Sequence, residues 1–397
     1  MMRDMREGWE IKKLGEIGKV SMCKRVFKED TTTEGGIPFY KIGTFGKNPD
    51  AFITKERYNE FRSKFSFPKK GDILISASGT IGRRVRYDGE PAYFQDSNIV
   101  WIDNNEKLVL NDYLYRFYEI CNWGASKGAT ISRLYNDNLK QIEISYPESL
   151  PEQQRIVAIL DKAFAAIAKA KANAEQNLQN AKELFESYLQ GVFERKGEGW
   201  EENILKEVCE LKSGTTISPS LERTEGDVLY TKVGDMNLPD NEVEINTSSR
   251  FVNSKEIKIN QIIPEGAIIF PKRGGAIATN KKRKIIKPTI VDLNTMAIIP
   301  SKKIDKDYFF HWFQLFDLNS ISNGANIPQI NNYSFDEVYI PYPKSIKQQQ
   351  VIVQKLDELL TETKKLEAIY QQKINDLEEL KKSILQKAFS GGLNYDF

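Results

Sequence analysis

A chain of 397 residues exceeds the size of one ordinary hydrophobic core, so we expect more than one domain. Hydrophobic residues make up 40% of the chain and charged residues 28%, a balance that is typical of a folded protein and excludes wholesale disorder. The net charge of +2 excludes no class of ligand, because a basic surface can be offset by acidic helices elsewhere.

Residues that bind metals or enter membranes are sparse. The three cysteines, Cys23, Cys121 and Cys209, form no Cys-x-x-Cys pair, and His311 is the only histidine, so we expect no metal site. No apolar run approaches the roughly 20 residues that cross a bilayer, and the N-terminal segment has no apolar stretch behind its charges. The sequence therefore predicts a cytoplasmic protein without a bound metal.

The first part of the chain, residues 1–150, mixes short β-rich runs with Gly, Asn, Asp and Pro. The run from Gly71 to Ser76 is an example, because Ile73, Leu74 and Ile75 follow a turn signal. We expect this part to be a globular head made of irregular sheet and long loops.

The next stretch, residues 151–196, has no proline after Pro151 and is rich in Ala, Leu, Glu, Lys and Gln. This composition predicts one long helix, on the order of 65 Å over residues 151–193. Apolar and small residues recur in steps of three and four, as in a coiled coil. The predicted seam consists of Leu160, Ala163, Ile167, Ala170, Ala174, Ala181, Leu184 and Tyr188.

The second half of the chain repeats the first in the same order. Segments of one half match segments of the other at an offset that grows from 191 to 196 residues, as changes in loop length would produce. Two unrelated α/β domains would not keep this order. The matches include Gly8-Trp9-Glu10 with Gly199-Trp200-Glu201, Lys41 with Lys232, Gly128-Ala129 with Gly324-Ala325, and Gln153-Gln154 with Gln349-Gln350. We therefore expect a second head over residues 197–343 and a second helix with a C-terminal tail over residues 344–397.

The second helix carries a seam in the same phase as the first. It consists of Leu356, Leu359, Leu366, Tyr370, Leu377, Leu380 and Ile384. Small residues dominate the first seam and large ones the second, so we expect the two helices to pack on each other. The alternative is that each helix packs on its own head. Antiparallel pairing would place two equivalent heads at a fixed separation, and duplex DNA is a ligand with two such surfaces.

Basic residues beside glycines are candidates for contact with DNA phosphates, and Arg, Asn and Gln are candidates for reading base edges. The alternatives are a solvated charged face and tight turns that the fold requires. The candidates are Lys41, Ser78, Thr80, Arg83, Arg84, Lys127, Arg133 and Asn136 in the first head and Lys232, Lys272, Arg273, Lys281, Lys282, Arg283, Asn326 and Gln329 in the second.

With these features, the chain resembles the specificity subunit of type I restriction-modification systems over nearly its whole length. The resemblance is carried by the Gly-Trp opening of each head, the segment Ser78–Gly82, the loop Gly128–Thr130 that leads to Leu134 and Leu139, the helix entry Pro151–Val157, and the end Leu385–Leu393. One departure is visible, because Lys347 and Gln348 replace the Pro151 and Glu152 of the first helix entry. Ser345 still offers a helix cap there.

The resemblance implies an α+β fold in which two repeated α/β target-recognition domains are joined by two long antiparallel coiled-coil helices with pseudo two-fold symmetry. Each head would read one half of a bipartite site in double-stranded DNA. The helices would set the gap and dock two modification (methyltransferase) subunits, which join restriction (translocase/nuclease) subunits. S-adenosylmethionine, ATP and Mg are expected in those partner subunits, and no cofactor is expected in this chain.

The sequence shows no catalytic machinery of its own. It contains no phosphate-binding Gly-x-x-x-x-Gly-Lys-Ser/Thr loop, and we expect His311 to be a partly buried member of an aromatic cluster. Asp240 followed by Glu256 and Lys258 matches a short nuclease pattern, but the first repeat has no copy of it. We therefore expect a subunit that is not an enzyme by itself. The alternative function is a coiled-coil scaffold whose heads bind protein, and the salt dependence of binding would distinguish the two.

Overall fold

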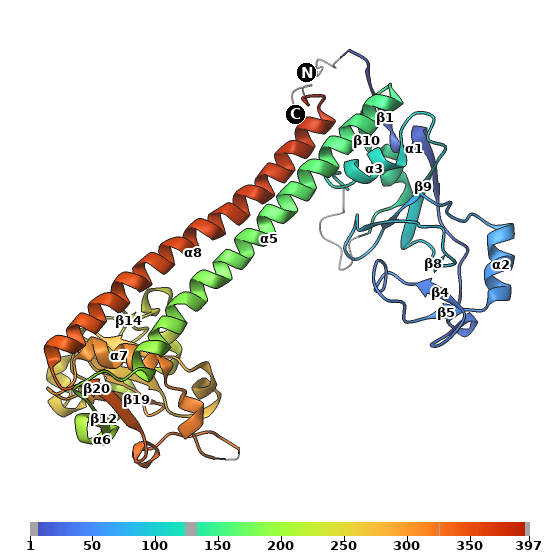
Figure 1. Cartoon of the computed structure of the whole chain (residues 1–397). Helices are drawn as coiled ribbons and strands as arrows, with labels where there is room; N and C mark the ends of the chain where they lie inside the picture. Colours follow the sequence, from blue (N-terminus) through green and yellow to red (C-terminus); the bar gives the residue numbers. More distant parts are fainter. Residues whose placement is uncertain (1–6, 124–132, 325, 394–397) are drawn as a thin grey trace. The chain divides into compact units, whose positions relative to one another are not determined.

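The computed structural model describes residues 7–123, 133–324 and 326–393, and Figure 1 traces the whole chain. The chain divides into two compact units, which are described here one at a time. Unit 1 comprises residues 1–175 and 372–397, and unit 2 comprises residues 176–371. Head 1 is the part of unit 1 that precedes the first long helix, and head 2 is the part of unit 2 between the two long helices.

Head 1 contains three sheets with the strand orders β1-β10, β2-β9-β6-β7 and β3-β5-β4-β8. The strands are β1 (Trp9–Lys13), β2 (Gly18–Ser21), β3 (Thr31–Thr32), β4 (Ile37–Tyr40), β5 (Phe52–Ile53), β6 (Ile73–Ser76), β7 (Arg84–Arg86), β8 (Tyr93–Phe94), β9 (Ile99–Asn104) and β10 (Glu143–Pro147). The short helices are α1 (Leu14–Ile17), α2 (Lys55–Lys64), α3 (Asn111–Phe117) and α4 (Asn136–Gln141). Strand β6 is buried along its whole length because it lies between β9 and β7.

Head 2 repeats the same plan with sheets ordered β11-β20, β12-β19-β16-β17-β14 and β15-β13-β18. The strands are β11 (Trp200–Ile204), β12 (Cys209–Ser213), β13 (Val228–Thr231), β14 (Glu244–Ile245), β15 (Phe251–Val252), β16 (Ile268–Pro271), β17 (Arg283–Ile285), β18 (Thr289–Val291), β19 (Thr295–Pro300) and β20 (Tyr339–Pro343). Its α-helices are α6 (Leu205–Val208) and α7 (Lys306–Leu315), and several 3-10 turns connect the strands. The β6-β9 pair of head 1 thus returns as the β16-β19 pair of head 2.

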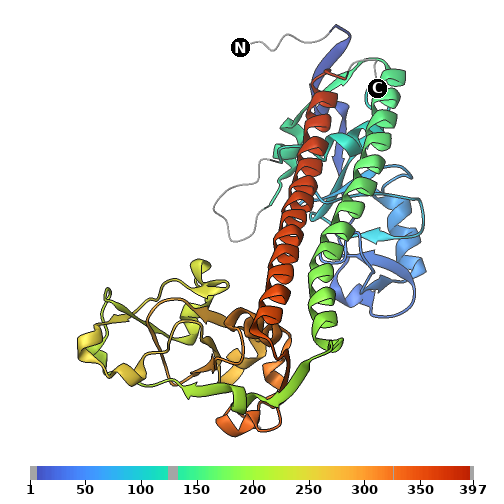
Figure 2. The same ribbon diagram turned by 60° about the vertical axis from the view of Figure 1, so that its left-hand side comes forward.

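The two long helices are α5 (Leu150–Glu194) and α8 (Ile346–Phe389), close to the predicted bounds. Within unit 1, the start of α5 lies antiparallel to the end of α8 (Figure 2). Lys171 Nζ is 2.6 Å from a carboxylate oxygen of Glu378. In each unit the apolar core of the head continues into both helices. The helices therefore pack on each other and on the heads, so both packing arrangements considered from the sequence occur together.

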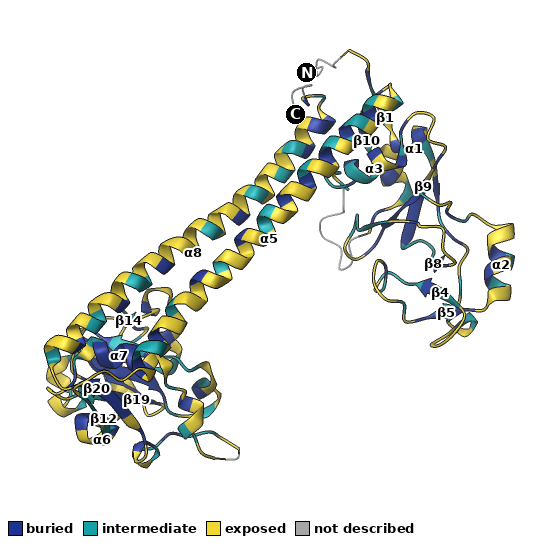
Figure 3. Ribbon diagram, in the orientation of Figure 1, coloured by how far each residue is buried: buried dark blue, intermediate teal, exposed yellow. Residues whose placement is uncertain are grey.

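The buried stripe of the helices differs from the predicted seam at four residues. Leu160, Ile167, Ala174, Ala181 and Leu356 are buried, whereas Leu184, Tyr188, Leu366 and Leu380 are exposed. Figure 3 shows that buried, intermediate and exposed residues alternate along both long helices. Of the other predicted seam residues, Ala163, Ala170, Leu359, Tyr370, Leu377 and Ile384 are half-buried. In α5 the side facing the core carries the half-buried Phe185 and the buried Leu189 in place of Leu184 and Tyr188. The reason is that an α-helix repeats every 3.6 residues and drifts about 20° per heptad.

A buried glutamine fastens the start of each long helix to its head. Gln153 Nε2 donates to the carbonyls of Leu108 (2.7 Å) and Pro147 (2.9 Å), and its Oε1 accepts from Leu110 N (2.9 Å). Gln349 makes the same three bonds to Lys303 (3.0 Å), Pro343 (2.8 Å) and Asp305 (2.7 Å). Both glutamines are fully buried, so all their polar atoms must be bonded within the protein. The Gln-Gln match in the sequence is therefore a structural clamp that occurs twice.

Candidate nucleic-acid interface

Three segments of head 2 lie side by side and form a small polar platform. Arg273 pairs with Gln329, and Gln329 pairs in turn with Asn323, each as a single antiparallel bridge. The Gln329 and Asn323 backbones exchange two hydrogen bonds of 2.7 and 2.9 Å. Directly opposed residues in such pairs project their side chains to one face. Arg273, Gln329 and Asn323 therefore present their polar ends together, and we call these three residues the head 2 platform.

Head 1 builds the matching bridge at the equivalent positions. Ser78 pairs with Arg133, and Leu134 N donates to the Ala77 carbonyl at 2.8 Å, as Ile330 N donates to the Lys272 carbonyl at 2.9 Å in head 2. The turn that follows uses a glycine with a left-handed backbone in both heads, Gly79 (φ 66°) and Gly274 (φ 71°). The two heads thus share the same backbone pairing. The arginine is the second partner of the bridge in head 1 (Arg133) and the first partner in head 2 (Arg273).

Among the candidate residues, a few keep exposed side chains free for a ligand. Across the part of the chain that the structure describes, the guanidinium groups of Arg133 and Arg273 make no hydrogen bond or ion pair within the protein. The same holds for the side chains of Thr80 and Asn326, which are exposed, and for those of Asn136 and Gln329, which are half-buried. Arg133 and Asn136 also line an open pocket of about 460 Å³ with Met22, Ser97, Leu134, Tyr135 and Asp137.

Lys282 and Arg283 do not form the exposed basic run that the sequence predicts. Lys282 is only 1% exposed. Its ammonium donates to the carbonyl of Phe316, which directly follows α7, at 2.5 Å and to the side chain of Asn280 at 3.1 Å. Burial lowers the pKa of Lys282 to about 8. The Arg283 guanidinium donates to the carbonyls of Asn241 and Met236, and burial lowers its pKa as well. Both residues hold loops of head 2 together and are removed from the candidate interface.

Three candidates of head 1 also have structural partners. Ser78 donates to Asn98 Oδ1 at 2.8 Å, and Arg83 donates to the Phe45 carbonyl at 3.0 Å. Arg84 forms an ion pair with the buried Glu119 at 2.8 Å and lies over the ring of Tyr115. A single sequence cannot separate such residues from phosphate contacts, because both uses place a basic residue beside a glycine turn.

The remaining lysines are partly exposed and make surface contacts. Lys41 pairs with Asp50 at 2.9 Å, and Lys232 pairs with Glu222 at 3.1 Å. Lys272 donates to Ser213 Oγ at 3.0 Å, and Lys281 donates to Asn237. Such contacts in solvent are weak enough to exchange for a phosphate. Lys127 and the loop Gly128–Thr130 lie outside the described residues.

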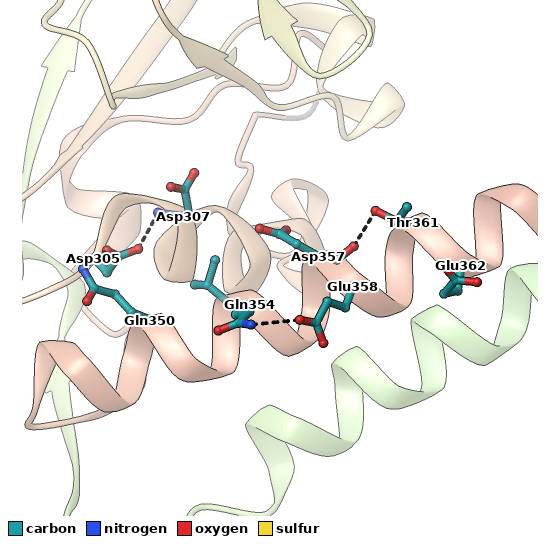
Figure 4. Close-up of a pocket in the computed structure, with 9 residues that line it drawn as sticks. Asp305, Asp307, Gln350, Gln354, Asp357, Glu358, Thr361 and Glu362 are labelled. Carbon is teal, nitrogen blue, oxygen red and sulfur yellow. Dashed lines mark hydrogen bonds between the residues drawn. The ribbon is translucent and has the colours of Figure 1, made fainter.

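A groove of about 800 Å³ in unit 2 is acidic, in contrast to the basic candidates for DNA contact (Figure 4). It lies between the start of α7 and one face of α8, and it is lined by the carboxylates Asp305, Asp307, Asp357, Glu358 and Glu362 together with Gln350, Val353, Gln354 and Thr361. Five acidic groups repel a phosphate backbone. The groove therefore marks a face of unit 2 that does not favour DNA.

The part of the chain that the structure describes contains neither a metal-binding cluster nor a helix that could cross a membrane. In residues 7–123, 133–324 and 326–393, no three His, Cys, Asp or Glu side chains are grouped to hold a metal ion. His311 lies in an aromatic cluster, as predicted, but it is buried (4% exposed) and not partly buried. Its Nε2 is 2.8 Å from Asp357 Oδ1. Glu256, part of the short nuclease pattern, is paired with Arg223 at 2.7 Å. None of the described helices is both long and apolar enough to cross a membrane.

The chain belongs to the type I restriction modification DNA specificity domain family, whose domain matches it twice, over residues 6–177 and 197–379. It is thus a two-domain specificity subunit of the type I restriction-modification class. The match confirms the family that the repeat and its motifs predicted. It also confirms the α+β class with two repeated heads and two long helices.

Individual relatives agree with this assignment. Over 149 residues the chain is 66% identical to a Haemophilus influenzae protein assigned as type I restriction enzyme specificity subunit S.HindORF215P, a match that spans 38% of each chain. It is 25% identical to the MjaIX specificity subunit of Methanocaldococcus jannaschii over 98% of this chain and 94% of that one. A solved chain from a study of complex assembly and conformational transition of the type I R-M system superposes with a TM-score of 0.78 at 16% identity, over 98% of this chain and 100% of that one. At that identity the superposition shows the fold alone.

Proposed function

We propose that this chain reads a bipartite site in double-stranded DNA, one half with each head, and is non-catalytic by itself. The observation that carries the proposal is the matching bridge in the two heads, Ser78 with Arg133 in head 1 and Arg273 with Gln329 in head 2. Among the described residues, the guanidinium of each of these two arginines makes no hydrogen bond or ion pair. A guanidinium is a fork of donors that fits the O6 and N7 acceptors of guanine in the major groove. Because each of the two repeated heads carries one such guanidinium, the chain is suited to a DNA site with two halves.

The two heads differ in what surrounds each arginine. Ser78 stands opposite Arg133 in head 1, whereas the amides of Gln329 and Asn323 stand beside Arg273 in head 2. An amide side chain matches the donor and acceptor pair of adenine. The heads therefore read different sequences, and the proposed site is asymmetric.

The paired helices have two roles in this proposal. They hold the heads at a fixed separation and thereby set the gap between the half-sites, and they dock two modification subunits that recruit restriction subunits. S-adenosylmethionine, ATP and Mg act in those partners. The proposed domains are residues 1–150 and 197–343 for the readers and residues 151–196 and 344–397 for the helices and tail.

Substitution of Arg273 tests the proposal. The chain with its modification subunits is incubated with random-sequence duplexes, and the bound pool is sequenced. Arg273→Ala should relax the sequence preference in one half-site by about tenfold and leave the other half intact. Lys287→Ala is the control, since Lys287 is exposed and lies outside the platform.

Two outcomes would contradict the proposal. A preference that is unchanged in both halves would remove Arg273 from base reading. A complex that selects no motif at all, with an affinity that stays constant between low and physiological salt, would favour heads that bind protein on a coiled-coil scaffold.

A further inference from the structure

An exposed tyrosine completes the platform of head 2. Tyr333 lies in the 3-10 turn Asn332–Phe335 and is 59% exposed, which is unusual for so large a ring. Its hydroxyl oxygen is 3.1 Å from the side-chain nitrogen of Asn323, a platform residue, and 3.1 Å from that of Asn331. Tyr333 therefore reaches the face on which Arg273 and Gln329 are displayed.

The two amides restrict what the Tyr333 hydroxyl can still do. A phenolic oxygen has two acceptor lone pairs and one O–H donor. Asn323 and Asn331 each donate to this oxygen, so both lone pairs are occupied and only the O–H remains. The group can thus bond an acceptor on a ligand and cannot accept from one.

The chain on both sides of Tyr333 is anchored in the core of head 2, which fixes the position of the tyrosine ring. Ile330 and Phe335, which flank Tyr333 in the sequence, are almost fully buried in the apolar core of head 2. Asn331 N also donates to Ser334 Oγ at 3.1 Å and closes the turn. An anchored donor loses little conformational entropy on binding, which is the condition for a selective contact.

We propose that Tyr333 is a specificity-determining residue of head 2, whose O–H donates to an acceptor on a base edge in the major groove. The acceptors available there are N7 of a purine, O6 of guanine and O4 of thymine. The inference rests on the proposed function, because it assigns a further reader to the same DNA site. A cytosine N4 amino group, which is only a donor, is excluded at the contacted position.

Head 1 carries a related residue two places earlier in the repeat. Tyr135 is 57% exposed and follows Leu134, which belongs to the bridge of that head, and it lines the pocket that holds Arg133 and Asn136. The hydroxyl of Tyr135 has no such pair of amide donors among the described residues, so its acceptor capacity is retained. The two tyrosines thus differ in chemistry as the two half-sites differ in sequence.

The test removes one atom from Tyr333. Tyr333→Phe keeps the ring and removes the donor, and the full chain with its modification subunits is used to select from random-sequence duplexes. Tyr339→Phe is the matched control, because Tyr339 is 52% exposed in head 2 and lies in strand β20 outside the platform. Thermal unfolding of each variant shows whether its fold is retained.

The expected result is a loss of preference of about tenfold at one base position of one half-site, with the Tyr339→Phe complex unchanged. Tyr333→Ala should relax the same position. An unchanged motif in Tyr333→Phe, or weaker binding spread evenly over all sequences as for a phosphate contact, overturns the inference while the bipartite site stands. Failure of the unsubstituted complex to select any split motif refutes the proposed function itself.

Discussion

The two units attach their heads to the long helices at equivalent positions but with different chemistry. In unit 1, Arg116 of α3 donates to Asp161 of α5 at 2.9 Å. The Glu119 carboxylate forms ion pairs with Arg84, with Arg116 and with Lys381 of α8. In unit 2 the counterparts of Arg116, Asp161 and Lys381 are His311, Asp357 and Phe185. His311 bonds Asp357 at 2.8 Å and packs against the Phe185 ring.

The duplicated contact between head and long helix thus keeps its position in the two units while its electrostatics change. The carboxylate on the long helix is retained in both units, as Asp161 and Asp357. Its partner is a permanent cation in unit 1 and a titratable imidazole in unit 2. The buried glutamine clamp, by contrast, is the same in both. We therefore expect the units to respond alike to loss of the clamp and differently to charge and pH.

The largest expected effect on the free energy of unfolding comes from loss of the glutamine clamp that both units share. Gln153→Leu or Gln349→Leu removes the partner of one part-buried backbone N–H and of two carbonyls, which should cost about 3 kcal/mol in the free energy of unfolding of the affected unit. Urea unfolding measures the loss, and hydrogen exchange assigns it to a unit. Gln154→Leu, at an exposed neighbouring position, should be close to neutral. Equal stability of the Gln153 and Gln154 variants would show that the clamp has no energetic role.

Glu119→Gln should destabilise unit 1 by roughly 2 kcal/mol, because three cations lose the negative charge they surround and Glu119 is only 7% exposed. Burial raises the pKa of Glu119, but the hydrogen bond from Arg116 and the charges of Arg84 and Lys381 leave the pKa below its usual value. Hydrogen exchange should rise at the C-terminal end of α8.

The position-matched control in unit 2 is Gln314→Ala, which removes an exposed side chain. It should leave both units unchanged. If Glu119→Gln loosened the two units equally, the charged junction would not be local to unit 1.

Acid should weaken unit 2 through His311. Burial lowers the pKa of His311 below its ordinary 6.5, and nearby Lys284 lowers it further, while Asp357 and Asp307 oppose this shift. The unfolded chain then binds a proton more readily, so the stability from His311 is complete above pH 6.5 and is lost as the pH falls through the folded pKa. The slope is at most about 1.4 kcal/mol per pH unit.

The measurement is the urea midpoint of unit 2 between about pH 8 and pH 5, followed by hydrogen exchange. His311→Gln should flatten this dependence, and Arg116 should contribute none to unit 1 in the same range. A steeper acid loss in unit 1 than in unit 2 above pH 5 would contradict the assignment.

The smallest expected effect concerns the exposed ion pair between the helices. Lys171→Ala removes the contact with Glu378, and both partners are open to solvent, so no measurable change in the unfolding midpoint is expected. Ile167→Ala, one turn earlier and buried, should cost roughly 2 kcal/mol or more. A larger loss for Lys171 than for Ile167 would mean that charge, and not apolar packing, holds the helices.

The sequence was most informative where periodicity and repetition act over many residues. The repeat, the two long helices and the family followed from patterns of this kind, whereas the exposure of Leu184 and Leu380 followed from a helical drift that a strict heptad ignores. The fate of single side chains could not be predicted. Lys282 and Arg273 look alike in the sequence, and only the fold determines that one is buried behind α7 and the other is exposed. Tyr333 was missed because its position depends on Asn323, ten residues away.

The most direct test of two independent readers is an exchange of one head. Residues 1–150 are replaced by the equivalent head of a relative, and the duplexes selected by the full complex are sequenced before and after the exchange. Two independent readers should give a split motif with a constant gap, in which only one half changes. A change in both halves, or a single continuous motif, would contradict it.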